Sequence, residues 1–154
     1  MNLPAPHRVA NAFVDAIREG STAFAWQLLE PSYRMTLVRR WVDQHPQLAA
    51  LDLDQERDNI LRATGAWSDF PALCRNHLLL LLPPATERWG WATRPRPVEP
   101  GLEKVLFANV DAVNQGFARL PAEADTVVAR AITFYMRADG DSWSIASIDE
   151  PDEF

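Results

Sequence analysis

Three residues of this sequence have side chains that could handle a proton. His77 falls on the apolar stripe of a leucine-rich segment, where an imidazole in a dry pocket could move a proton near neutral pH; the alternative is a buried histidine satisfied by a backbone carbonyl. Asp43 could act as a general base if a pocket raised its pKa, or could be a solvated surface carboxylate. Tyr33 could donate a hydrogen bond to an oxyanion or to a neighbouring carbonyl. No spacing pairs any of the three with a partner, so they are catalytic candidates without a catalytic signature.

The tryptophan content points to binding more than to chemistry. Six of the 154 residues are tryptophan, and large rigid aromatic side chains suit an apolar ligand pocket or an interface core equally well. Most of them are expected in the ordinary core. The segment Trp89-Gly90-Trp91 is the exception, because two rings on one side of a strand, beside a proline-rich stretch, could line a pocket mouth or a dimer seam.

Two residues near the end of the chain could orient a ligand. Arg130 interrupts the core-facing side of a predicted strand, where it could anchor a carboxylate-bearing ligand or pair with an acid; alternatively it lies at the open edge of the sheet. Tyr135 could donate a phenolic hydrogen bond. The residues predicted to line a ligand pocket are Trp41, Trp67, His77, Trp91, Arg130 and Tyr135.

The remaining histidines and the cysteine are expected to have structural roles or none. His45 precedes Pro46 at a helix end and should stabilise that terminus, whereas His7 is expected to be exposed to solvent. Cys74 has no base beside it and should behave as a small hydrophobic residue. Three scattered histidines and one cysteine make no metal-ligand spacing, and neither GxGxxG nor GKS occurs. The sequence therefore predicts no metal site and no cofactor.

Charge and cysteine content limit the partners and the compartment. A net charge of −6 opposes attraction to a phosphate backbone, so a nucleic-acid partner is not expected. The longest apolar run, Leu78 to Leu82, is far below the roughly 18 residues of a membrane span. The first residues lack the basic and apolar segments of a signal peptide. With a single cysteine, a reducing cytoplasm is the simplest location.

The first half of the chain has helical spacing of its apolar residues. One helix is predicted over Pro6 to Glu19 with Gly20 as its stop, and a second begins at Ser21-Thr22 and ends before Pro31. A third helix runs from Pro31 to between Asp43 and His45. Further helices are expected from Asp54 to Gly65 and after Ser68 or Asp69. The last of these has its apolar stripe at Phe70, Leu73, Cys74, His77, Leu78 and Leu81.

After Pro83-Pro84 the pattern becomes that of strands. Strands are predicted at Trp89 to Thr93, Glu103 to Val110, Asp125 to Arg137 and Ser142 to Asp149, and the last two form a hairpin through Ala138 to Asp141. The proline-rich stretch from Arg94 to Gly101 is a loop or an edge. The whole chain, 1–154, is predicted to be one α+β domain, helical over 1–82 and mainly strand over 87–149, with a tail at 150–154.

Two segments resemble the nuclear transport factor 2-like superfamily, which includes ketosteroid isomerase and polyketide cyclases. They are AFVDAIREGSTAFAWQLLEPSYR and VVARAITFYMRADGDSWSIASID, whose motifs are the helix corner AWQLLEP and the hairpin DGDSWSI. Residues 46–101 depart from the family with extra helix and a proline-rich loop. The resemblance implies a cone, in which a curved antiparallel sheet holds the N-terminal helices on its concave face, with an apolar pocket at the open end.

The resemblance also implies frequent dimerisation through the outer face of the sheet, and it implies no particular activity. In the isomerase an oxyanion-holding tyrosine sits on the first helix, whereas Pro6 to Glu19 contains no tyrosine.

Three functional hypotheses follow. The first is a bacterial-type domain that binds a small hydrophobic molecule in a tryptophan-lined pocket without a cofactor. The second is a cofactor-free isomerase, cyclase or dehydratase in which His77 or Asp43 moves the proton and a tyrosine or Arg130 holds the oxyanion. The third is a homodimeric interaction protein without catalysis.

Overall fold

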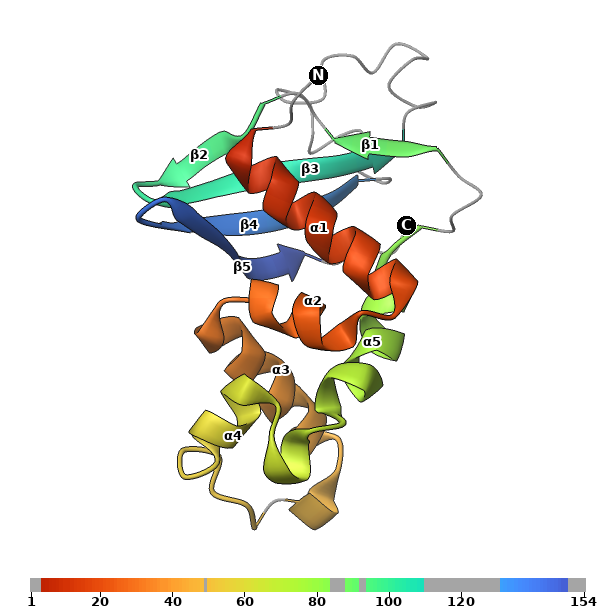
Figure 1. Cartoon of the computed structure of the whole chain (residues 1–154), viewed down its shortest axis with the longest axis vertical. Coiled ribbons are helices and arrows are strands. Elements are labelled where there is room, and N and C mark those ends of the chain that lie inside the picture. The colour runs from red at the N-terminus through yellow and green to blue at the C-terminus, as the bar shows by residue number, and fades with distance from the viewer. Residues whose placement is uncertain (1–3, 49, 84–87, 92–93, 110–130, 150–154) are drawn as a thin grey trace.

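The computed structural model describes residues 4–48, 50–83, 88–91, 94–109 and 131–149, in which helices precede a curved, unclosed antiparallel sheet (Figure 1). The predicted α+β class is therefore confirmed. Helix α1 crosses one face of the sheet, and the other helices lie beyond the β5 edge of the sheet. The elements are α1 (Ala5–Glu19), α2 (Thr22–Leu28), α3 (Pro31–Asp43), a 3-10 turn (Pro46–Leu48), α4 (Arg57–Arg62), a second 3-10 turn (Gly65–Trp67), α5 (Phe70–Leu81), β1 (Trp89–Trp91), β2 (Arg96–Glu99), β3 (Leu102–Asn109), β4 (Ala131–Asp139) and β5 (Ser142–Asp149).

Helix α1 ends where the sequence predicts. Gly20 adopts the left-handed conformation with φ of 85°, which a residue with a Cβ adopts only with strain, and its N–H donates to the carbonyl of Ala16. From the facing helix α5, Arg75 donates to the carbonyls of Ile17 and Arg18, the first at 2.7 Å. Because the last carbonyls of a helix have no partner within it, these bonds join the end of α1 to α5.

The short helix α4 is held by side chains of other helices. Its C-terminal carbonyls accept hydrogen bonds from Trp26 of α2, which binds Ile60 at 3.0 Å, and from Arg34 of α3, which binds Leu61 at 2.7 Å. Arg34 also donates to the carbonyl of Leu29. A six-residue helix is too short to be stable alone, so these bonds fix its position.

The sheet has the order β1-β3-β4-β5, and β2 pairs with β3 beside β1. The predicted terminal hairpin is confirmed, with Gly140 at φ 60° in its turn. The proline-rich stretch from Arg94 to Gly101, predicted to be a loop or an edge strand, contains the edge strand β2, which pairs with β3. The ladder between β4 and β5 is irregular between Tyr135 and Met136, and the carbonyl of Ile145 accepts from the N–H of Glu30. That bond joins the start of α3 to the edge of the sheet.

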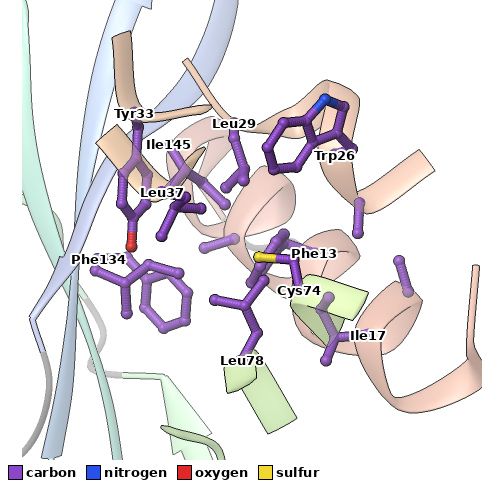
Figure 2. Packing of buried hydrophobic residues seen from close by; sticks show 14 of the residues in the cluster. Phe13, Ile17, Trp26, Leu29, Tyr33, Leu37, Cys74, Leu78, Phe134 and Ile145 are labelled. Atoms are coloured by element: carbon purple, nitrogen blue, oxygen red, sulfur yellow. The ribbon is translucent and has the colours of Figure 1, made fainter. Parts of the chain in front are cut away.

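One apolar core continues from the sheet into the helices. Figure 2 shows Phe13 of α1, Phe134 of β4 and Ile145 of β5 beside Leu37 of α3 and Leu78 of α5. Phe134 and Ile145 have no exposed surface, and Phe13 retains 1%. The helix–sheet interface is therefore closed by side chains at these positions.

Three local expectations are wrong. His7 is fully buried instead of exposed, with its ring edge-to-face against Trp91 at 6.1 Å. Asp54 does not begin the fourth helix: the side chain of Asp52 accepts from the backbone of Asp54, and the helix starts at Arg57. The predicted apolar stripe of α5 is partly wrong as well, because Leu73 and His77 are exposed.

Candidate functional site

A groove of about 340 Å³ lies between α3 and α5. The two helices are held by different neighbours: α5 packs mainly on α2 and α1, and α3 mainly on α4 and β5. They meet through the rings of Trp41 and Phe70, which are 5.7 Å apart and nearly perpendicular. The residues that line the groove are Leu37, Arg40, Trp41 and Gln44 from α3, and Phe70, Leu73, Cys74 and His77 from α5.

The floor of the groove is apolar and firmly supported. Leu37, Phe70 and Cys74 are buried, and burial raises the pKa of the Cys74 thiol to about 12. That thiol is therefore protonated at neutral pH and acts as a small apolar side chain, as predicted. Phe70 is surrounded edge-on by Trp26, Trp41 and Trp67, with ring centroids 5.3 to 5.9 Å away. Such aromatic packing gives the floor a defined shape.

The rim of the groove is exposed and carries polar groups. Leu73 retains 54% of its surface, and Arg40, Gln44 and His77 are exposed. Among the described residues that line the groove, Arg40 is the single formally charged one. Within the part of the chain that the structure describes, no carboxylate lies within ion-pair distance of Arg40. An apolar floor with a few polar groups at its rim is the usual composition of a small-molecule site.

The predicted apolar stripe of α5 is partly wrong. Phe70, Cys74 and Leu78, four residues apart, face the core with Pro71. Leu73 and His77 lie on the exposed side, and Leu80 is 85% exposed. His77 is therefore not an imidazole in a dry pocket; it lines the open side of the groove.

The three catalytic candidates are not brought together in the groove. His77 lines it, whereas Asp43 is exposed at the end of α3 and is not among its lining residues. Tyr33 is buried in the core, where Figure 2 shows its ring near Phe134. The groove therefore has no acid–base pair made from these residues.

Of the six residues predicted to line a pocket, two line this groove and a third supports it. Trp41 and His77 line the groove, and Trp67 packs behind it against Phe70 while its indole N–H donates to Glu56 at 3.2 Å. Arg130 lies outside the described residues.

Trp91 and Tyr135 belong to the sheet and lie away from the groove. Trp91 of β1 packs on Phe107 and Phe134, and its indole donates to Asn11 of α1 at 2.9 Å, so it joins the sheet edge to α1. Tyr135 lies on the face opposite Phe134. Burial, and then a hydrogen bond with the nearby Asp149 carboxylate, raise the pKa of its phenol.

His45 has the position that the sequence predicts. Its Nδ1 lies 2.7 Å from the carbonyl oxygen of Trp41, and its ring stacks on the indole of Trp41 at 4.3 Å. Since a carbonyl only accepts, Nδ1 carries the proton and donates. His45 thereby closes the last turn of α3 and packs on the indole of Trp41.

Five lining residues were not singled out from the sequence: Leu37, Arg40, Gln44, Phe70 and Leu73. The signal that could have found them is a repeated spacing. The groove residues of α3 lie at 37, 40, 41 and 44, and those of α5 lie at 70, 73, 74 and 77. Both sets follow the i, i+3, i+4, i+7 rule for one side of a helix. Two such stripes predict facing helices.

The described ranges contain neither a cluster of metal-ligating side chains nor a helix suited to a membrane. No group of three or more His, Cys, Asp and Glu side chains there could hold a metal ion. None of the helices there combines the length and the apolar character needed to cross a bilayer. No family model, curated protein or solved structure matches this chain. The groove is therefore interpreted from its own geometry.

Proposed function

We propose that this domain binds a small apolar molecule in the groove between α3 and α5. The observation that carries the proposal is a groove of about 340 Å³ with a buried apolar floor and an aromatic wall. A volume of about 150 Å³ accommodates a benzene ring, so this groove has room for about two rings or a short alkyl chain. Such a ligand would remove Trp41 and Leu73 from water, which favours binding.

Catalysis is not part of this proposal. Acid–base catalysis commonly uses a proton acceptor and a proton donor placed together in one site. Of the candidate proton-handling residues, His77 alone lines the groove.

Equilibrium dialysis with 1-naphthamide, a neutral two-ring probe, tests the proposal. The wild type should bind one molecule per chain saturably. Gln44→Trp and Leu73→Trp each place an indole in the groove from opposite helices and should weaken binding at least tenfold. Gln47→Trp adds the same side chain at an exposed position outside the groove and should bind as the wild type does. The proposal is refuted if the wild type shows no saturable binding, or if both groove variants bind the probe as tightly as the wild type does.

The resemblance to the nuclear transport factor 2-like proteins remains part of the proposal, as does a cytoplasmic location. The order of elements, with helices first and a hairpin last, supports the resemblance. In that family the pocket is expected between helices and sheet, whereas the groove lies between α3 and α5. Helix α5 falls in residues 46–101, the segment in which the sequence departs from the family. The proposed site therefore uses an element that the family pattern does not supply.

A second candidate function is self-association through the helical half. Three of the large apolar side chains exposed among the described residues, Phe24, Leu73 and Leu80, lie on α2 and α5. By contrast, Leu106 and Ala108 on the outer face of β3, opposite Val105 and Phe107, are buried, so these two positions offer no exposed apolar surface for a partner. Sedimentation velocity at rising concentration distinguishes the two functions: a dimer that Leu80→Glu dissociates favours association, and a monomer at all concentrations excludes it.

A further inference from the structure

We infer that the ligand of the α3–α5 groove is a small carboxylic acid, with its carboxylate at Arg40 and its apolar body against Trp41 and Phe70. This inference rests on the proposed function and adds the chemical class of the ligand. It is carried by the charge and the hydrogen-bonding state of the residues that line the groove.

The charge of the lining is positive in an acidic protein. The chain has 21 Asp and Glu residues against 15 Lys and Arg, yet of the eight lining residues that the structure describes none is acidic and one is arginine. Asp43, three residues after Arg40 on the same helix, forms no ion pair with it. A cationic ligand would meet Arg40 with no carboxylate to offset the repulsion, whereas an anionic ligand would neutralise it.

The dipoles of the two helices do not reverse the preference for an anionic ligand. Trp41 lies in the last turn of α3 and Phe70 is the first residue of α5, and the two rings are in contact. The negative end of one helix dipole therefore lies beside the positive end of the other, so their effects on a charge in the groove oppose each other. The formal charge of Arg40 therefore decides which ligand charge the groove favours.

The groove also offers hydrogen-bond donors that are not already used. The indole N–H groups of Trp26 and Trp67 donate to Ile60 and Glu56. By contrast, neither the indole of Trp41 nor the side chain of Arg40 makes a hydrogen bond within the described part of the chain. A planar guanidinium can bind both oxygens of a carboxylate at once, which an amide or an alcohol cannot exploit equally.

Comparing 1-naphthoate with 1-naphthamide at pH 7 tests this inference, because the two probes share the ring system and differ in charge. Arg40 is exposed, so its attraction for a carboxylate is screened by water, and wild-type protein should bind the acid about fivefold more tightly than the amide. The preference should fall as sodium chloride is raised from 0.05 to about 0.5 M.

Three variants test whether Arg40 causes the preference for 1-naphthoate over 1-naphthamide. Arg40→Gln should abolish the preference for the acid by weakening acid binding more than amide binding, and Arg40→Lys should retain part of the preference. Arg39→Gln is the matched control, because it removes the same charge from an exposed position on α3 that does not line the groove.

The inference is overturned if wild type binds acid and amide equally, or if the preference survives Arg40→Gln. In both cases amide binding still supports the groove as a site. If neither probe binds, the proposed function itself fails.

Discussion

The helix–sheet interface and the α3–α5 groove are both built from helix faces with the same spacing, yet one is closed and the other open. Across the sheet, α1 presents Ala10, Phe13, Val14 and Ile17, none of which retains more than 1% of its surface. Across the groove, Leu37 and Phe70 are buried while Leu73 is half exposed. The first interface contributes apolar burial to stability. The second leaves apolar surface that a ligand could cover.

The support of the two regions also differs. The sheet is held by a backbone ladder and by direct apolar packing against α1. The helical half shares this apolar core and adds side chains that bind the carbonyls at helix ends: Arg34 and Trp26 bind the end of α4, and Arg75 binds the end of α1. Such polar links can hold helices in place without filling the space between them, which is how α3 and α5 face each other across a groove.

The largest expected effect is at the helix–sheet interface. Phe134→Ala removes a fully buried ring that packs on Phe13 and Trp91. The free energy of unfolding should fall by about 3–5 kcal/mol, measured by urea denaturation. Leu80→Ala, at an 85% exposed position of α5, should change it by less than about 0.5 kcal/mol. Similar losses for both variants would contradict the burial of Phe134 and the exposure of Leu80.

A smaller effect is expected where polar links hold the helices. Arg34→Met keeps a side chain of similar length but removes the hydrogen bonds to the carbonyls of Leu29 and Leu61. Burial lowers the pKa of the Arg34 guanidinium, so part of the gain from these bonds offsets its desolvation. The net loss in free energy of unfolding should be about 2 kcal/mol.

Arg39→Met, exposed on the same helix, is the control for Arg34→Met and should be nearly neutral. If Arg34→Met stabilises the protein, the cost of burying the guanidinium exceeds its hydrogen bonds, and α4 is held by packing instead.

The order of the elements could be predicted from the sequence because the residues that begin and end them act locally. Pro31, Gly20 and the Asp139-Gly140 turn act through the backbone within a few residues, and all three mark real boundaries. The burial of His7 could not be predicted, because it depends on Trp91, which is distant in the sequence.

The openness of the groove was harder still to predict. Residues 10, 13, 14 and 17 and residues 70, 73, 74 and 77 share one spacing, and the spacing fixes which side chains lie together. What differs is composition: the α1 set is wholly apolar, whereas Arg40, Gln44 and His77 appear in the groove. Polar side chains within an otherwise apolar stripe were the sequence signal of an open site, and assigning His77 to a dry pocket missed it.

The smallest effect on stability should come with an effect on binding. Leu73→Ala truncates a rim residue that retains 54% of its surface, so the free energy of unfolding should change by less than about 0.5 kcal/mol. The affinity for 1-naphthamide should fall about threefold to fivefold, because a ligand would bury the surface that folding leaves exposed. Val98→Ala on β2, at 49% exposure, should alter neither quantity. A loss of more than about 2 kcal/mol for Leu73→Ala would place this side chain in the core, and the contrast between a closed interface and an open groove would then be wrong.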